Sequence, residues 1–304
     1  MSELLRTSEP VRAALAEGRG VVALETSVLA QGLPHPRNLE AAERMSAAIV
    51  SRGAIPAWIG VRRGSVVVGL QDTELETFAG RAAPVKVAPR DLPPVLASGR
   101  SGATTVSATV WAAHRAGIPV AATGGIGGVH PGTGDVSADL QELASVPILL
   151  VCSGPKSIVD PVATADRLEE LGVTAVGYRC ERLPFFLARE APVALEHRVD
   201  SAAGAAEVTR IHARLGVRSA ILLCNPIPTE QAMDGGEVAA AAGACERRAR
   251  VEGVRGKNLT PFLLRCLSER TDGRSLEANL ALLESNAALA AEVAVALAEE
   301  RSLT

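Results

Sequence analysis

A unit made of a helix, a glycine and a short apolar strand recurs along the chain, in residues 112–125, 167–179 and 211–226. Glycine ends helices readily, because it adopts the left-handed conformation at little cost. The apolar stretches that come after the glycines are continuous and do not alternate with polar residues, which indicates strands buried on both faces. The repeated unit therefore predicts a parallel sheet covered by helices.

Three other stretches extend this pattern. Residues 21–30 and 146–154 are apolar and predict further central strands, and an alanine- and leucine-rich helix is predicted from about Ser275 onward. Neither a linker nor a low-complexity segment interrupts the chain, so residues 1–304 are predicted to form a single domain. Its predicted fold class is α/β, with three α/β/α layers around a central, largely parallel sheet.

Composition narrows the kinds of protein that this chain can be. Hydrophobic residues make up 47% of the 304 residues but aromatic residues only 2%, so the core is predicted to consist mainly of Ala, Val, Leu and Ile. The net charge of -3 and the lack of aromatic platforms argue against nucleic acid as a partner, because a general nucleic-acid-binding protein carries a basic face.

The sequence also indicates the cellular compartment of the protein. No apolar run reaches roughly 18 residues and the N-terminal segment lacks a hydrophobic signal region, so we expect no membrane association and a cytoplasmic location. The five cysteines form no CxxC pair, which is typical of small buried residues in a reducing compartment. They are Cys152, Cys180, Cys224, Cys245 and Cys266.

Candidate chemistry is expected where predicted strands end, because ligands of parallel α/β sheets bind beyond the carboxyl ends of the strands. These places are Glu25 and residues 124–128, 154–156 and 225–226. A carboxylate such as Glu25 is costly in an apolar strand unless it is paired or functional. It is predicted to be either a general acid or base with a raised pKa, or the partner of a structural arginine.

Only three of the 31 basic residues are lysines, namely Lys86, Lys156 and Lys257. Lysine can lose its proton and act as a nucleophile when burial or a nearby cation lowers its pKa, whereas arginine cannot. Lys156 follows a predicted buried strand and a Gly-Pro turn, and Lys86 also follows a short apolar stretch. If both lie in one pocket, each lowers the pKa of the other, and an imine with a sugar aldehyde becomes possible. The alternative is a composition that merely favours arginine, and we prefer that alternative for Lys257.

Two segments contain residue types that are suited either to anion binding or to a structural role. Thr104 and Thr105 lie near the start of a predicted helix, where they either cap the helix or help to bind an anion. Residues 123–130 contain four glycines, which allow close approach of the backbone to a ligand or form a tight structural turn. This segment matches neither nucleotide-binding glycine motif. His130 at its end is more often a hydrogen-bonded structural residue than a catalyst in such a setting.

Asp135 and Asp139 are the carboxylates of the next segment. Asp139 precedes Glu142 by three residues, which fits a helix N-cap, and Asp135 fits a local turn. A single carboxylate near a phosphate is nevertheless enough to hold Mg²⁺ or Mn²⁺, because these ions keep several waters and use substrate oxygens. The sequence contains no zinc-type cluster of histidine and cysteine.

Together these motifs resemble the pseudouridine-5'-phosphate glycosidases, also called indigoidine synthase A-like proteins, from about residue 10 to residue 298. The blocks that carry the resemblance are VALETSVLAQGLPHP, GATTVSATVWAAHRAGIPVAATGGIGGVH, DVSADLQEL, CSGPKSIVD, NPIP, GKNLTPFLL and SLEANLALLESNAALAAEVA. The resemblance implies reversible cleavage of the C–C glycosidic bond of pseudouridine 5'-phosphate to uracil and ribose 5-phosphate. It also implies an α/β/α core, a homotrimer, and one Mn²⁺ or other divalent metal ion per subunit.

The resemblance further implies roles for individual residues. Lys156 matches the nucleophile, Glu25 the proton donor and Asp135 the metal ligand. Implied substrate contacts are Lys86, Thr105, Val106, His130, Ser137, Ala138, Asp139 and Asn279. The chain departs from the family pattern in a shorter loop at residues 131–134, and in the order Thr-Ser after the glutamate where Ser-Thr is commoner.

The implied mechanism is an imine between Lys156 and ring-opened ribose, with Glu25 moving the protons. One alternative is a lysine-imine lyase or aldolase that acts on another sugar phosphate, which releases no uracil. A second alternative is a sugar-phosphate sensor or an accessory factor in pigment biosynthesis, which binds without forming product. Ordinary glycosidases use two flanking carboxylates, and the sequence contains no convincing pair of that kind.

Overall fold

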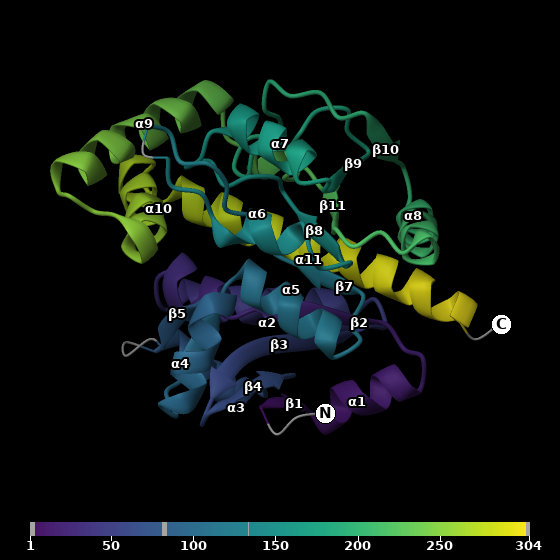
Figure 1. Ribbon diagram of the computed structural model, residues 1–304. Coiled ribbons are helices and arrows are strands. Elements are labelled where there is room, and N and C mark those ends of the chain that lie inside the picture. Colours follow the sequence, from purple (N-terminus) through teal and green to yellow (C-terminus); the bar gives the residue numbers. More distant parts are fainter. Residues whose placement is uncertain (1–3, 81–83, 133, 302–304) are drawn as a thin grey trace.

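The computed structural model describes residues 4–80, 84–132 and 134–301 (Figure 1). Eleven strands form one sheet, in the order β1-β4-β3-β2-β7-β8-β11-β9-β10, with β6 paired to β3 and to β5. The strands are β1 (Leu5–Thr7), β2 (Val21–Glu25), β3 (Ile55–Arg62), β4 (Ser65–Val68), β5 (Val85–Val87), β6 (Gly102–Thr104), β7 (Val120–Ala122), β8 (Leu149–Cys152), β9 (Thr174–Tyr178), β10 (His197–Val199) and β11 (Ile221–Cys224). Of the ten pairings within the described ranges, only β3–β4 and β3–β6 are antiparallel, so the predicted largely parallel sheet is confirmed.

Helices cover both faces of this sheet. They are α1 (Glu9–Ala16), α2 (Arg37–Val50), α3 (Asp72–Ala79), α4 (Leu92–Ala97), α5 (Val106–Arg115), α6 (Ala138–Leu143), α7 (Pro161–Glu170), α8 (Ala202–Leu215), α9 (Gly235–Val251), α10 (Leu259–Arg270) and α11 (Arg274–Arg301). Short helical turns occur at η1 (Val28–Gly32), η2 (Pro89–Asp91), η3 (Thr229–Gln231) and η4 (Gly256–Asn258).

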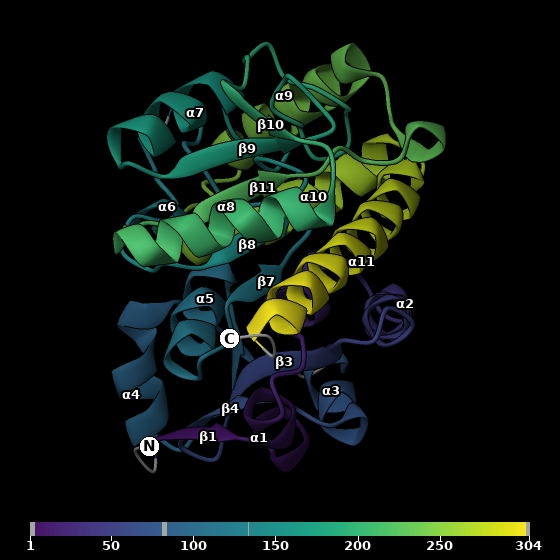
Figure 2. The same cartoon turned by 90° about the vertical axis from the view of Figure 1, so that its right-hand side faces the viewer.

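The sheet is buried on both faces, as the continuous apolar runs predict. Along β11, Ile221 and Leu223 pack into one apolar cluster, while Leu222 and Cys224 pack into the other. The first cluster includes residues of α2, α8 and α11, and the second includes residues of α1, α5 and α6. Figure 1 shows α5 and α6 on one side of the strands, and Figure 2 shows α8 and the long α11 on the other. The predicted three-layer α/β/α fold is therefore confirmed.

The three recurring units fold as predicted. Helices α5, α7 and α8 are followed by Gly117, Gly172 and Gly216, whose φ angles are +81°, +70° and +68°. Strands β7, β9 and β11 come next along the chain and run parallel to their neighbours in the sheet. The glycines end each helix because a side chain disfavours this left-handed backbone.

The strand predicted for residues 21–30 is only half as long. Strand β2 ends at Glu25, and the chain then turns into η1. The hydroxyl of Thr26 donates to the carbonyl of Ile59 (2.7 Å). The amides of Leu29 and Ala30 donate hydrogen bonds to the carbonyl of Thr26 (3.1 Å each). These local bonds replace the sheet ladder, so the apolar residues after Thr26 pack as a helical turn.

The expectation of five unpaired cysteines is wrong for two of them. Cys245 of α9 and Cys266 of α10 form a disulfide, with Cα atoms 5.7 Å apart. They are 21 residues apart in sequence, and only the packing of α9 against α10 brings them together. Cys152 and Cys224 are buried and free, as predicted.

The predicted alanine- and leucine-rich C-terminal helix is confirmed as α11, and its apolar stretch is longer than the expected limit of roughly 18 residues. The segment Arg274–Glu299 is long and apolar enough to cross a membrane, although 67% of its most apolar window is buried inside the protein. Helix α11 packs against α2, α8 and strands β2, β7 and β8. Such burial is typical of the core helix of a globular domain.

Candidate active site

Two adjoining cavities lie where the carboxyl ends of the central strands meet. The polar cavity contains ten of the eleven predicted site residues, which are Glu25, Lys86, Thr105, Val106, His130, Asp135, Ser137, Ala138, Asp139 and Lys156. The eleventh, Asn279, lines the second cavity together with Gln31, and we call this space the amide cavity. Both cavities share Glu25, Ser27, Lys86, Lys156 and Thr260 as walls. The structure thus gathers residues from six separate sequence motifs around two lysines and a glutamate.

Glu25 lies at the last position of β2 and is only 4% exposed. The hydroxyl of Thr123 donates to its Oε1 (2.5 Å), and the hydroxyl of Ser27 donates to its Oε2. The alternative prediction of an arginine partner is wrong, because within the described part of the chain this carboxylate accepts its hydrogen bonds from hydroxyls. Hydroxyl partners orient the carboxylate and leave it able to exchange a proton.

Lys156 lies in a conformationally constrained turn after β8. Gly154 has a φ of +73°, and a Cβ on it would lie 1.9 Å from the carbonyl oxygen of Pro184, so only glycine fits. Pro155 forms a bridge with Ile126 of the glycine-rich segment, and the amide of Lys156 donates to the carbonyl of Ile126 (2.9 Å). The turn therefore fixes where the lysine side chain leaves the backbone.

Lys86 extends from β5 into the same two cavities. Burial lowers the pKa of its ammonium, and the positive charge of Lys156 lowers it further, while Asp139 and Glu25 act in the opposite direction. Lys86 and Lys156 therefore share a pocket. The lowered pKa favours the uncharged form of the Lys86 amine.

The depressed pKa of Lys86 makes a prediction about stability. Protonating this amine costs more in the folded protein than in the unfolded chain, and the cost disappears as pH rises through the folded pKa toward 10.5, the ordinary lysine value. Between neutral pH and about pH 10, the wild type is therefore expected to gain stability relative to Lys86→Met. Urea unfolding of both proteins at several pH values measures this difference, and a constant difference contradicts the assignment.

The start of α5 lines the polar cavity. Thr105 caps the helix by accepting a hydrogen bond from the amide of Ala108 (3.4 Å), so the capping prediction is confirmed. Val106 and Ser107 follow it in the cavity wall. The first amides of a helix point outward and carry partial positive charge, and here the Ser107 amide already donates to the Asp139 carboxylate (3.0 Å).

Asp139 does not cap its own helix, contrary to the capping prediction. Ser137 is the N-cap of α6 and accepts from the amide of Asp139 (3.2 Å). The Asp139 carboxylate accepts instead from the amides of Ser107 (3.0 Å) and Gly127 (2.9 Å). It thereby ties α5 to the glycine-rich segment, a role that depends on contacts distant in sequence.

The glycine-rich segment needs its small residues for close packing. A Cβ on Gly127 would lie 2.3 Å from the Ser137 hydroxyl, and one on Gly125 would lie 2.7 Å from the ring of Phe186. Asn286 of α11 donates to the carbonyl of Thr123 (2.9 Å) and so holds the beginning of the segment. The predicted tight structural turn is confirmed, and Gly124, Gly125 and Gly127 of this turn also line the two cavities.

His130 and Asp135 lie at the outer end of the polar cavity. Burial lowers the pKa of His130, with the charge of Asp135 acting against it, and the His130 amide donates to the carbonyl of Asp135 (2.9 Å). No group of three or more His, Cys, Asp or Glu residues that could hold a metal ion occurs in the described ranges. Residue 133 of the short loop lies outside the described residues. Asp135 is exposed and faces the cavity, which fits an ion held by one carboxylate, water and substrate oxygens.

Several residues of the site were not predicted. Lys257 of η4 also lines the polar cavity, where its ammonium pairs with Asp91 (2.7 Å), so all three lysines of the chain meet there. The scarcity of lysine is the signal in the sequence that singles out Lys257. Gln31 lies just beyond the segment predicted as a strand, in the block VALETSVLAQGLPHP, where only Glu25 is singled out. Asn225, which was predicted to mark chemistry, instead donates to Asn286 (2.9 Å).

Comparison with known proteins places these features in context. A family model described as "Indigoidine synthase A like protein" matches residues 10–296. A pseudouridine-5'-phosphate glycosidase of Sorangium cellulosum is 46% identical over 301 residues, covering 97% of this chain and 94% of that protein. One of Caldanaerobacter subterraneus subsp. tengcongensis is 43% identical over 300 residues, covering 98% of each chain.

Two solved structures are similar over nearly the whole chain. The prealnumycin C-glycosynthase AlnA, in complex with ribulose 5-phosphate, superposes with a TM-score of 0.91 at 37% identity and 100% coverage of both chains. An indigoidine synthase A-like protein of Thermotoga maritima superposes with a TM-score of 0.90 at 37% identity and 98% coverage of both chains.

Proposed function

This chain belongs to the indigoidine synthase A-like family, and from that membership we propose that it is a pseudouridine-5'-phosphate glycosidase. It reversibly cleaves the C–C bond between ribose 5-phosphate and uracil, a lyase-type reaction of nucleotide catabolism. The observation that supports this proposal most is the shared wall of the two cavities, which Lys156, Lys86 and Glu25 form together. In this proposal the polar cavity takes the sugar phosphate and the amide cavity takes the base.

Lys156 is the proposed nucleophile. Its neutral amine bonds to C1 of the ribose, the bond from C1 to the ring oxygen breaks, and that oxygen takes a proton. The nitrogen lone pair then forms an iminium while the C–C bond electrons leave to C5 of uracil, which is protonated. Water hydrolyses the iminium, which releases ribose 5-phosphate and restores the amine.

Glu25 is the proposed proton carrier for these steps. A carboxyl group at the wall common to both cavities reaches the sugar from one side and the base from the other. Its two hydroxyl partners, Thr123 and Ser27, keep it oriented while its protonation changes. General acid–base catalysis of this kind typically contributes about 10²–10⁴-fold to the rate.

The remaining predicted residues bind the substrate in this proposal. The start of α5, with Thr105 and Val106, holds the 5'-phosphate, and Lys86 lies beside the reacting carbon. Ser137, Ala138 and Asp139 line the opposite wall, with His130 at the outer end. Asn279 contacts the base from the amide cavity.

Asp135 is the proposed protein ligand of a divalent metal, with Mn²⁺ as the expected ion and one per subunit. When bound, such an ion neutralises negative charge on the substrate and orders water around it. Asp135 contributes a carboxylate at the exposed end of the polar cavity, and its backbone carbonyl holds the amide of His130. We further propose that the protein is a homotrimer and that it is located in the cytoplasm. Analytical ultracentrifugation of the purified protein tests the trimer.

Product analysis tests the proposed function. Purified protein incubated with pseudouridine 5'-phosphate and Mn²⁺ is expected to release uracil and ribose 5-phosphate in equal amounts, and a chelator is expected to reduce the rate by about 10-fold or more. Chromatography with ultraviolet detection quantifies both the substrate and the free base. Turnover of other sugar phosphates without uracil supports a lysine-imine aldolase instead, and binding without product supports a sensor.

A further inference from the structure

Two buried carbonyl oxygens have no hydrogen-bond partner within the described part of the chain, and both belong to residues of the amide cavity. They are Oε1 of Gln31 and Oδ1 of Asn279. An unsatisfied buried acceptor is costly, so native proteins retain one mainly where a ligand or water satisfies it. Two such oxygens on residues that line one cavity indicate a ligand that offers two N–H or O–H donors.

The rest of the cavity indicates the shape of that ligand. Val28, Phe186, Leu264 and Leu283 add apolar walls to the two amides. The Phe186 ring packs against Gly124 and Gly125, and its amide donates to the carbonyl of Ser153 (2.7 Å). Apolar walls with a small number of fixed polar groups suit a flat heterocycle that carries donors on its edge.

The Gln31 amide is held in place by the surrounding structure. The Gln31 amide nitrogen donates to the carbonyl of Pro84 (2.8 Å), which leaves its oxygen as the free end of the side chain. Buried Asn38 donates to the carbonyls of Leu29 (2.8 Å) and Ala79 (3.0 Å), so it anchors η1, the turn that carries Gln31.

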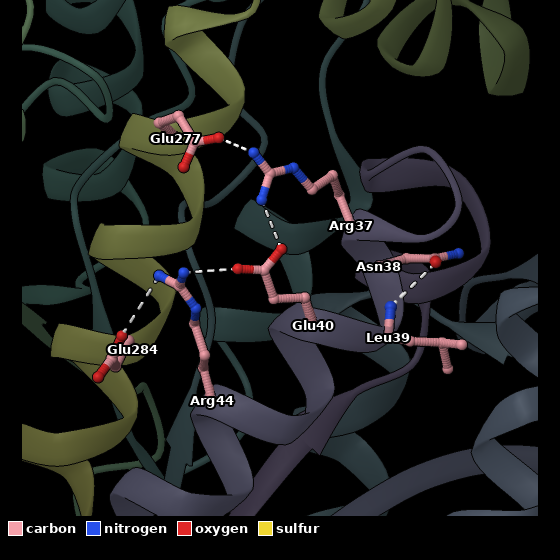
Figure 3. Close-up of polar contacts among 7 residues, drawn as sticks. All are labelled: Arg37, Asn38, Leu39, Glu40, Arg44, Glu277 and Glu284. Carbon is pink, nitrogen blue, oxygen red and sulfur yellow. Dashed lines mark hydrogen bonds and ion pairs between the residues drawn. The ribbon is translucent and has the colours of Figure 1, made fainter.

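Ion pairs connect this anchor to the helix that carries Asn279. Figure 3 shows Arg37 of α2 reaching Glu277 of α11, two residues before Asn279, and Arg44 reaching Glu284 (3.8 Å). Glu40 lies between the two arginines and pairs with both (2.6 and 2.5 Å). Each exposed pair contributes little to stability by itself. Together they join α2, whose Asn38 anchors η1, to α11, which carries Asn279.

These observations match one chemical feature of a carbon-linked uracil. Its ring is attached to ribose through C5, so both ring nitrogens keep a hydrogen, whereas a nitrogen-linked uracil keeps only one. We propose that Gln31 and Asn279 each accept one ring N–H of the base, so that the pair selects carbon-linked over nitrogen-linked nucleotides. This inference rests on the proposed function and adds Gln31 as a residue that determines its specificity.

Methylated bases in the synthetic direction test the inference. Wild-type protein is given ribose 5-phosphate with uracil, 1-methyluracil or 3-methyluracil, and kcat/KM is measured for each base. Gln31→Met is expected to lower kcat/KM for uracil by about 10- to 100-fold. It is expected to leave kcat/KM unchanged for the methyluracil whose methyl group replaces the ring N–H that Gln31 accepts. Asn279→Leu is expected to do the same with the other methyluracil. A residue with only a structural role lowers all three values by the same factor, and that result overturns the inference.

Three controls distinguish a wrong inference from a misfolded variant and from a wrong proposed function. Borohydride trapping of ribose 5-phosphate on the enzyme requires no base, so both variants are expected to trap as the wild type does if they are folded. Leu264→Ala enlarges the same cavity without touching an acceptor, and it is expected to affect all three bases equally. Should a variant fail to fold, inhibition of the wild type decides: equal inhibition by uracil and both methyluracils overturns the inference. A wild type that forms no product from uracil refutes the proposed function itself.

Discussion

Replacing Lys156 with arginine is expected to abolish cleavage of pseudouridine 5'-phosphate, with a loss on the order of 10⁴-fold or more. Arginine keeps a positive charge at the junction of the two cavities, but a guanidinium cannot lose its proton and attack C1 of the sugar. The variant therefore separates nucleophilic chemistry from simple charge stabilisation. Stopped assays of uracil release at saturating substrate provide the rate.

Trapping gives a second and independent readout of the same group. Borohydride added to the wild type with ribose 5-phosphate is expected to reduce the imine and to leave one pentose phosphate on the peptide that contains Lys156. In Lys156→Arg this mass increment is expected to disappear. Lys257→Arg is the matched control, because it changes the third lysine of the polar cavity in the same way and keeps a cation opposite Asp91. An increment on any other residue, or normal rates in the arginine variant, excludes Lys156 as the nucleophile.

The parts of the fold that depend on local sequence were predictable. Gly117, Gly172 and Gly216 mark helix ends through their own backbone preference, and the apolar runs after them indicate buried strands without knowledge of neighbours. The position of the site was predictable too, because carboxyl ends of parallel strands converge on one edge of the sheet. That rule alone placed Glu25 and Lys156 together.

Pairings between distant residues could not be predicted from the sequence. Asp139 binds the amides of Ser107 and Gly127, and nothing in its own segment distinguishes that role from a helix cap. The Cys245–Cys266 bond likewise depends on how α9 packs against α10. Gln31 became a candidate only when its oxygen proved to be buried without a partner inside a cavity of the described structure. Each of these features is a property of the assembled structure.

Glu25→Gln is expected to slow uracil release by about 10²–10⁴-fold, which is the usual contribution of a positioned acid or base. Glutamine has nearly the same shape as glutamate, and its oxygen can still accept the hydrogen bond from Thr123 (2.5 Å in the wild type). It cannot exchange a proton, so C–C cleavage and protonation of the base are impaired, while Lys156 remains available for trapping by ribose 5-phosphate and borohydride. The expected signature is slow turnover with a retained adduct.

Thr123→Val is the matched variant, since it keeps the shape of the threonine and removes the hydroxyl that orients Glu25. Its expected loss is about 10-fold, smaller than that of Glu25→Gln, because the carboxyl group is still present and Ser27 still donates to it. The double variant is expected to lose little more than Glu25→Gln alone, because Thr123 acts through Glu25 and the two effects are not additive. If the losses multiply instead, Thr123 contributes to the reaction separately. If Glu25→Gln turns over at the wild-type rate, proton transfer in this site belongs to another group.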